Sequence, residues 1–143
     1  MAQTRDWIIV ASTPEAAMGV HRSTLRHDGR LAYASVLMGT FRPETFADGS
    51  VVHYYISKEE FDCEARSRTE RSVLMFGPSA NAVGPMPDLE TDYPVRPGSI
   101  YENILIAVCD GVSGLGGGGY DRPLDAIEGE RTKRLLGSLP VTD

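Results

Sequence analysis

Hydrophobic and polar positions divide the first half of the chain into alternating stretches that predict β-structure. Three short runs are rich in apolar and β-branched residues: 7–11, 31–38 and 51–57. The first run is followed by Ser-Thr-Pro, and each of the other two comes shortly after an Asp-Gly pair, which is a typical turn signal. The residues between the second and third runs, with Pro43 and Asp48-Gly49, predict a connection over 41–49. We therefore expect three strands joined by turns.

A period of two marks the next stretch, residues 61–70. One face of this predicted strand carries Phe61, Cys63, Ala65, Ser67 and Thr69, and the other carries Asp62, Glu64, Arg66, Arg68 and Glu70. Small or apolar residues opposite alternating charges are typical of a half-buried antiparallel strand. The pattern predicts that Cys63 points inward and that Arg66 and Arg68 project together from the charged face. Residues 73–76 continue this strand or form its partner.

The period changes from two to 3.6 after Pro97-Gly98, which predicts a helix over 99–109. Ser99 and Glu102 have the spacing of a capping box, in which the serine hydroxyl accepts from the amide of Glu102 and the carboxylate reaches back to the amide of Ser99. A single helical stripe then carries Ile100, Tyr101, Ile104, Leu105, Val108 and Cys109. This apolar face must lie on the sheet, so the predicted fold class is α+β.

The remaining segments have the composition of a loop, a linker and a tail. Residues 77–97 contain five prolines and predict an irregular excursion, longer than most loops of a compact domain. Residues 111–119 hold six glycines in nine positions, which predicts a flexible Gly-rich linker over 111–122. A short amphipathic helix is expected in the tail, 123–143, with Ile127 on its apolar side, a Glu130–Arg134 pair, and Gly129 as a weakness.

Composition and charge exclude several classes of protein. The chain has 143 residues, which suits one domain, and a net charge of −6 from 14 basic and 20 acidic residues. This balance disfavours nucleic-acid binding, because phosphate recognition needs a basic surface. No apolar run approaches the ~18 to 20 residues of a membrane span. The first residues show no secretory signal, so either the protein is cytosolic or a signal was removed before this sequence begins.

No group of residues indicates catalysis, a metal site or a cofactor. The glycine-rich segment lacks the Gly-Lys-Ser/Thr end of a phosphate loop, and Leu115 breaks the Gly-x-Ser-x-Gly spacing around Ser113. The three histidines, His21, His27 and His53, do not have the close spacing of a helical metal site. We therefore predict no catalytic residue, no metal ligand and no cofactor, and a protein that is not an enzyme.

Arg66 and Arg68 leave two interpretations open. In the first, they pair with carboxylates on their own or a neighbouring strand, which is the common fate of charges on a sheet face. In the second, they form a patch that binds an anion or a partner protein.

Two landmarks, in order with the opening of the chain, resemble a known family. The first is Phe61-Asp62-Cys63-Glu64-Ala65-Arg66-Ser67-Arg68, and the second is Pro97-Gly98-Ser99-Ile100-Tyr101-Glu102 followed by Cys109. With Asp6-Trp7-Ile8-Ile9-Val10, they resemble the surface-adhesin protein E-like family of Gram-negative bacteria over residues 6 to 110. Two features of the family pattern are missing: a Tyr-x-Asp segment, which reads Val20 to Leu25 here, and a tryptophan shortly before Pro97.

This resemblance implies a fold, a location and a kind of activity. The implied domain, residues 1–110, is an antiparallel sheet of about six strands packed by one helix and exported to the periplasm or cell surface. The implied protein is a non-enzymatic binding or structural protein, with a host or envelope protein as partner and with homodimerisation. Binding of host matrix proteins belongs to particular pathogen members. The alternative is a cytoplasmic interaction module whose C-terminal helix docks on a partner or dimer mate.

The two cysteines, too few for a zinc site, allow one disulfide. Pattern and resemblance together predict the bond between Cys63, on the inward face of 61–70, and Cys109, on the inward stripe of the helix. It would close a loop of about 46 residues and hold the helix to the sheet. Such a bond favours an oxidising compartment, whereas two buried reduced thiols are the other outcome.

Overall fold

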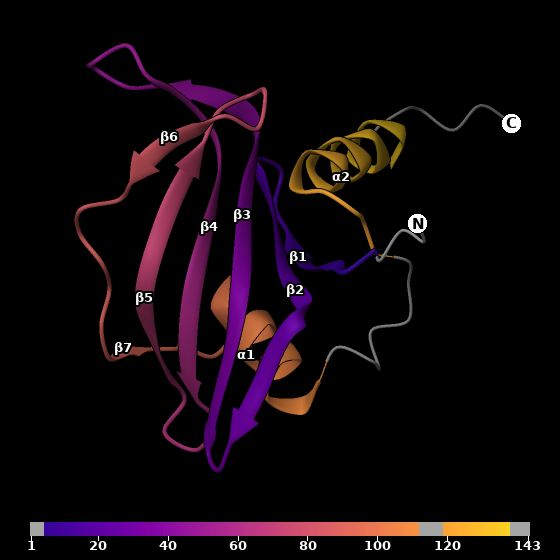
Figure 1. The fold of residues 1–143 in the computed structure, drawn as a ribbon. Helices are drawn as coiled ribbons and strands as arrows, with labels where there is room; N and C mark the ends of the chain where they lie inside the picture. The colour runs from indigo at the N-terminus through magenta and orange to yellow at the C-terminus, as the bar shows by residue number, and fades with distance from the viewer. Residues whose placement is uncertain (1–4, 112–118, 138–143) are drawn as a thin grey trace, which may run out of the picture.

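The computed structural model describes residues 5–111 and 119–137, and it shows an antiparallel sheet with two helices (Figure 1). The strands are β1 (Trp7–Ser12), β2 (Ala16–Asp28), β3 (Leu31–Thr45), β4 (Val51–Asp62), β5 (Ser67–Phe76), β6 (Ala82–Pro85) and β7 (Tyr93–Pro94), and the helices are α1 (Ile100–Asp110) and α2 (Pro123–Gly137). Strands β1 to β6 follow one another in chain order across the sheet, and β7 also pairs with β5. The predicted α+β class is confirmed.

Two strands differ from the sequence prediction: β2 was not predicted, and β3 is longer than the run that predicts it. β2 was not expected, because its polar second half conceals the period of a strand. β3 continues through residues 41–45, where a connection was predicted. A register shift between Gly39 and Glu44 leaves this part of β3 bulged against β4, and Pro43 falls in the bulge. A bulge tolerates proline, because the missing N–H is not needed there for the ladder.

The prediction of one continuous strand over 61–70 is wrong. Residues 63–66 form a turn that joins β4 to β5. Asp62 stabilises this turn, because its Oδ1 accepts hydrogen bonds from the backbone amides of Glu64 at 3.2 Å and Ala65 at 2.9 Å. Cys63 therefore lies in a turn and not on the inward face of a strand. Alternating charges alone did not distinguish a strand from a polar hairpin.

Helix α1 packs on one face of the sheet, and the larger buried cluster lies between them. The helix contributes Ile104, Leu105, Ala107 and Val108, and the sheet contributes Val20, Ala32, Val36 and Phe61, among others. These residues belong to β2, β3 and β4, so the helix covers the middle of the sheet. The predicted packing of this helix is confirmed.

The predicted cap of α1 is present, with one difference. Ser99 Oγ accepts from the amide of Glu102 at 3.3 Å, as a capping box requires. The carboxylate of Glu102 accepts instead from the amide of Gly98 at 3.1 Å. The amide of Ser99 is already bonded to the carbonyl of Arg96 at 3.2 Å. The helix start is therefore satisfied through the residue before the serine.

Helix α2 packs on the opposite face of the sheet. Successive strand residues point to opposite faces, and Val36 faces α1 whereas Leu37 and Gly39 face α2. Ala126 and Ile127 of α2 are buried in this second cluster with Trp7, Leu37 and Tyr54. A Cβ at Gly39 would lie 2.3 Å from Ile127 Cγ1, so the helix contacts the backbone of β3 directly.

The residues around α2 correct two details of the expected tail. Tyr120 exchanges two backbone hydrogen bonds with Trp7, of 3.0 and 2.9 Å, so the chain meets β1 just before α2. Glu130 accepts from the Tyr120 hydroxyl at 2.8 Å and pairs with Lys133 at 3.0 Å, in place of the expected Glu130–Arg134 pair. The glycine-rich residues 112–118 of the expected linker, and residues 138–143 of the tail, lie outside the described residues.

Candidate functional site

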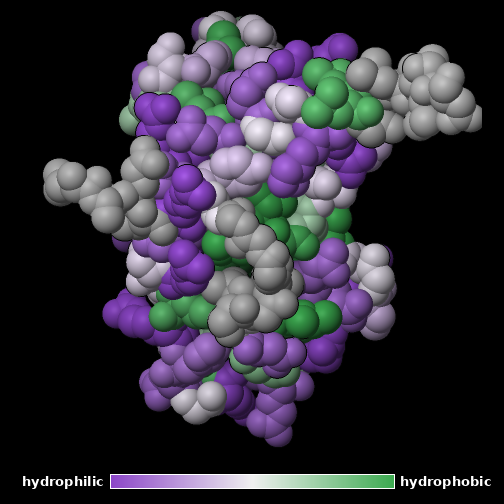
Figure 2. Space-filling model, turned by 90° about the vertical axis from the view of Figure 1, so that its right-hand side faces the viewer, coloured by the Kyte–Doolittle hydropathy of each residue, from purple (hydrophilic) through white to green (hydrophobic). Residues whose placement is uncertain are grey.

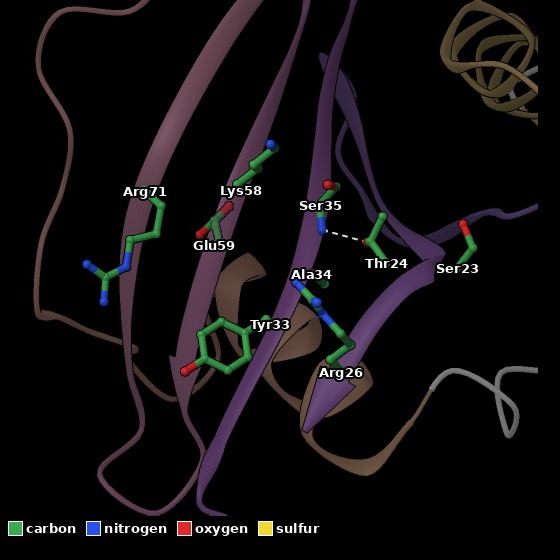
Figure 3. A pocket seen from close by; sticks show the side chains of 9 residues that line it. All are labelled: Ser23, Thr24, Arg26, Tyr33, Ala34, Ser35, Lys58, Glu59 and Arg71. Carbon is green, nitrogen blue, oxygen red and sulfur yellow. Dashed lines mark hydrogen bonds between the residues drawn. The ribbon is translucent and has the colours of Figure 1, made fainter. Parts of the chain in front are cut away.

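A groove opens on the sheet face that carries α2, beside the part that this helix covers. It has a volume of about 490 Å³ and runs across β2, β3, β4 and β5 (Figure 3). The side chains that matter for its chemistry are Thr24, Arg26, Tyr33, Ser35, Lys58 and Arg71. We refer to this feature as the groove. Antiparallel sheets commonly leave part of one face open to solvent, so its chemistry has to be judged from its side chains.

An irregularity in β2 shapes one wall of the groove. His21 pairs with Ser35 and Arg26 pairs with Tyr33, so four residues of β2 lie opposite a single residue of β3. Thr24 bridges the gap, because its Oγ1 accepts from the amide of Ser35 at 2.8 Å and donates to the carbonyl of His21 at 2.7 Å. The threonine hydroxyl thus replaces a backbone partner. Bulges of this kind redirect side chains and are frequent next to functional sites.

The groove is rich in cations, although the chain as a whole carries a charge of −6. Arg26, Lys58 and Arg71 surround it from three different strands. Arg71 Nη2 donates to both carboxylate oxygens of Glu60 at 3.0 Å, so its charge is matched. Among the described residues, Arg26 and Lys58 have no carboxylate within 4.0 Å. Two exposed cations are therefore available to a ligand.

Tyr33 lies half-buried on the floor of the groove, between these cations. Partial burial, and then the Glu60 carboxylate, raise the pKa of the Tyr33 phenol. The phenol therefore keeps its proton at neutral pH and can donate a hydrogen bond.

One hydroxyl–histidine pair, Ser23 and His21, lies beside the groove. Ser23 Oγ lies 3.5 Å from His21 Nε2, which is too long for an activated serine, and the His21 ring stacks on Trp7 with ring centroids 4.4 Å apart. Within the described ranges, no hydrogen bond joins His21 to a carboxylate that could orient it. The cations and hydroxyl groups of the groove suit the binding of an acceptor-rich ligand.

The structure separates the two arginines that the period of 61–70 placed on one face. Arg66 lies in the turn with a φ of 56°, and its Nη2 is 2.7 Å from Glu102 Oε2 on α1. Arg68 lies on β5 and is only 2% exposed. Arg66 is half exposed and Arg68 is inside the protein, so the two side chains do not share one surface.

Arg68 joins several elements through a buried ion network. Its Nη1 lies 2.8 Å from Glu59 Oε1 on β4, and its Nη2 bonds Glu90 in the segment between β6 and β7. The guanidinium also lies over the ring of Tyr101 on α1, 3.7 Å from the ring centroid. Burial raises the pKa of Glu59, and a hydrogen bond from Ser57 and the charge of Arg68 offset part of that rise. Arg68 thus follows the first interpretation of the sequence, in which these arginines pair with carboxylates on their own or a neighbouring strand.

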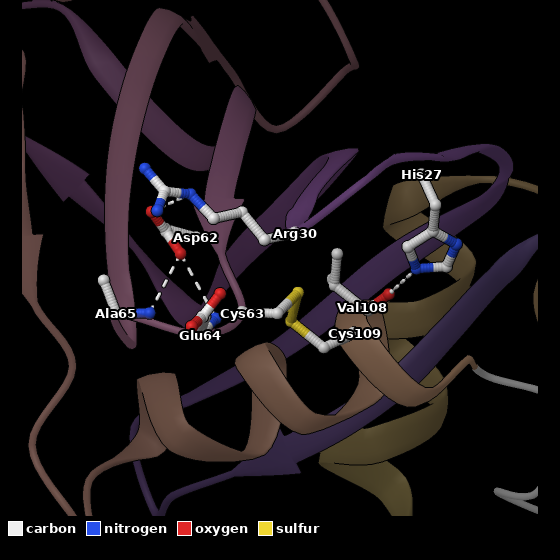
Figure 4. Close-up of a disulfide and its surroundings, with 8 residues drawn as sticks. All are labelled: His27, Arg30, Asp62, Cys63, Glu64, Ala65, Val108 and Cys109. Atoms are coloured by element: carbon white, nitrogen blue, oxygen red, sulfur yellow. Dashed lines mark hydrogen bonds and ion pairs between the residues drawn. A yellow bond between two sulfur atoms is a disulfide. The ribbon is translucent and has the colours of Figure 1, made fainter.

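A disulfide joins Cys63 to Cys109, as predicted, with the two Cα atoms 5.8 Å apart (Figure 4). It connects the β4–β5 turn to the last turn of α1. A second link holds the same end of the helix, because His27 Nε2 lies 2.8 Å from the carbonyl oxygen of Val108. Sheet and helix are thus joined at the end of the molecule away from α2 (Figure 1).

Comparison with known protein families places these features in a common domain. The family model of surface-adhesin protein E matches residues 7–110. The chain belongs to this family. The match runs from β1 to α1, so it includes the disulfide, the Arg68 network and the groove, and it ends before α2. Comparison with curated proteins and with solved structures gives no match.

Membership of the surface-adhesin protein E family indicates an adhesin-like binding protein. In the part of the chain that the structure describes, no group of three or more His, Cys, Asp or Glu side chains could hold a metal ion. Neither helix there has the length and hydropathy needed to cross a membrane. The surface on the side of β1 and α2 is largely hydrophilic, with hydrophobic side chains gathered near its middle (Figure 2).

The groove itself was not predicted from the sequence. Its cations come from strands that are far apart in the chain, and one of these strands, β2, was not expected. A signal was nevertheless present, because two neighbouring hydroxyl residues, Ser23 and Thr24, stand in the middle of the stretch that forms β2. Hydroxyl residues of this kind can replace backbone partners where a ladder is interrupted.

Proposed function

We propose that this chain is an exported, non-enzymatic binding protein that acts in the periplasm or at the cell surface. Membership of the surface-adhesin protein E family supports the binding role. The Cys63–Cys109 disulfide supports the location, because such bonds persist in oxidising compartments and are rare in the cytosol.

The partner, a host or envelope protein, is held in the groove. The observation that carries this part of the proposal is the pair of unmatched cations, Arg26 and Lys58, on the open part of the sheet. On the opposite face α1 covers the middle of the sheet, and the Arg68 charge there is matched by Glu59 and Glu90. The groove therefore offers charge that no other described group neutralises.

Export is tested on protein from the native gene in its native cell. Cells are fractionated in the presence of a reagent that adds a fixed mass to each free thiol. The protein of each fraction is then denatured with the same reagent, and its mass gives the number of free cysteines. The proposal expects untagged protein in the periplasmic or surface fraction. A Cys63→Ser variant, with one free thiol, calibrates the tag. Cytoplasmic protein with two tagged thiols would overturn the export proposal.

The alternative, a cytoplasmic module that docks through α2, has less support. Ala126 and Ile127 of α2 are already buried against its own sheet, next to Gly39. Homodimerisation is a separate part of the proposal, and light scattering on the purified chain tests it: a dimer mass supports it, and a monomer mass at high concentration contradicts it.

A further inference from the structure

We propose that the groove recognises an acidic segment of polypeptide, whose two carboxylates are held by Arg26 and Lys58. This inference rests on the proposed binding function and names the chemistry of the partner. It concerns the described residues of β2, β3 and β4, whose side chains Figure 3 shows around one hollow.

Unmatched charge is the first reason for this assignment. The side chains of Arg26 and Lys58 are exposed, whereas the third cation, Arg71, is held by Glu60. A carboxylate can form a charge-assisted hydrogen bond with each free cation without breaking any ion pair of the protein. The overall acidity of the chain makes such a local reversal of charge selective for acidic partners.

The spacing of the two cations sets the length of the segment. Arg26 is level with Tyr33, and Lys58 is level with Ser35, so the two cations lie on strands β2 and β4 on either side of β3. Strands are ~4.8 Å apart and residues rise ~3.3 Å each, which places the two backbone positions about 12 Å apart along a diagonal. Carboxylates four residues apart in an extended peptide lie on the same side of the chain and about 13 Å apart, within reach of these long side chains.

The position of the groove determines how the segment is held. β2, β3 and β4 are inner strands whose backbone groups are engaged by neighbours on both sides, so strand addition is not available. The irregularity of β2 would leave the Ser35 amide without a backbone partner, but this amide donates to the Thr24 hydroxyl. Recognition therefore depends on side chains, above all on Arg26 and Lys58.

The mixture of charges favours a peptide over a sulfated polysaccharide. Glu60 pairs with Arg71 at the edge of the groove, and the charge of Asp28 also acts on Tyr33. A densely charged polymer requires many unopposed cations, because its affinity comes from neutralising a row of charges. Two free cations with two carboxylates nearby suit a ligand that presents only a few acidic groups.

The test measures binding of a fluorescent peptide to the purified chain by anisotropy. The probe is a hexapeptide of Gly and Ser with two aspartates four positions apart, and the control peptide carries asparagine at both positions. At about 10 mM ionic strength, where charges act over about 30 Å, the aspartate peptide should bind at least about tenfold more tightly. Binding should weaken as salt is added.

Matched variants assign the binding to the groove. The double variant Arg26→Glu with Lys58→Glu should weaken binding of the aspartate peptide at least about tenfold. The control, Arg42→Glu with Arg96→Glu, changes the net charge equally at two exposed arginines outside the groove, and should change affinity less than about twofold. Circular dichroism verifies that both variants are folded.

Three results would overturn the proposal. They are equal affinity for the aspartate and asparagine peptides, equal loss in the groove and control variants, and binding of a heparin fragment by the groove without binding of the peptide. The last result would assign the groove to a polyanionic glycan. These outcomes are independent of the fractionation experiment, so a failed peptide assay with correct export would remove only the identity of the partner.

Discussion

The two helices cover the two faces of one sheet in different ways. α1 is attached by the Cys63–Cys109 disulfide and by Arg68, which meets Glu59 on the sheet and Tyr101 on the helix. α2 is attached by packing: among its side chains, Ala126 and Ile127 are the ones fully buried in the described part of the helix. α1 is thus held by the larger apolar cluster together with a disulfide and an ion network, whereas α2 is held by a smaller apolar cluster.

This difference indicates that the α1 face stabilises the domain, whereas the α2 face is available for binding. The family match includes the α1 face and ends before α2, so the closed face belongs to the shared domain. On the opposite face, α2 occupies one part (Figure 1), and the groove lies beside it (Figure 3). A rigid face behind the sheet can hold the side chains of an open face in fixed positions, which lowers the entropy lost on binding. Changing each attachment in turn tests this difference between the two faces.

Removing the disulfide should have the largest effect. The bond closes a loop across 46 residues, and loop-closure entropy predicts that the Cys63→Ser, Cys109→Ser variant loses about 4 kcal/mol of unfolding free energy. Urea unfolding with and without reductant measures this loss. The reductant should destabilise the wild type and leave the double variant unchanged. A loss below about 1 kcal/mol would mean that packing alone holds α1.

Arg68→Met should cost about 3 kcal/mol. The change removes the partner of a carboxylate that is buried with it, Glu59, and an unpaired buried charge is strongly unfavourable. Urea unfolding at neutral pH checks the value. The matched control is Arg66→Met, which breaks the partly exposed pair with Glu102 and should cost less than about 1 kcal/mol. Equal losses would contradict the buried role of Arg68.

Gly39→Ala should weaken the α2 face by about 2 kcal/mol. The new Cβ would lie 2.3 Å from Ile127 Cγ1, so the side chain or the helix must move. The double variant Gly39→Ala, Ile127→Ala removes the clash and should cost no more than Ile127→Ala alone. A double-mutant cycle from urea unfolding measures this coupling. Additive losses would show that α2 does not contact β3 at this position.

Acidification should weaken the α2 face by the smallest amount. Burial lowers the pKa of His53 below its usual ~6.5, and Glu128 and Arg131 of α2 act on it with opposite signs. The unfolded chain then binds the proton more readily than the folded one, so stability is full above about pH 6.5 and falls as the pH drops through the folded pKa.

The pH effect is checked by urea unfolding of the wild type and of His53→Phe at several pH values. Neither ring nitrogen of His53 has a hydrogen-bond partner in the described structure, so an apolar ring suits the site. The variant keeps His21 and His27, and its stability should fall less steeply with acid. Parallel curves for the two proteins would exclude a role for His53.

Local sequence signals predicted the elements that depend on near neighbours. The Ser99 cap and the stripe through Ile104 and Val108 predicted α1, because the residues of a helix interact within four positions. The tail helix and the cysteine pairing were also expected. The turn at 63–66 was missed, because the alternation of charged residues there also suits a strand, and Asp62 stabilises the turn through contacts that the alternation does not show.

The sequence by itself determined the fold class, the family, α1 with its cap, and the pair of cysteines that joins α1 to the sheet. Only the tertiary structure decided that the side chains of Arg66 and Arg68 lie apart, Arg66 at the surface and Arg68 in a buried ion network. It also decided that Arg26, Lys58 and Tyr33 meet in one groove. The reason is physical: periodicity records the environment of one strand or helix, whereas register and bulges determine which residues from different strands become neighbours.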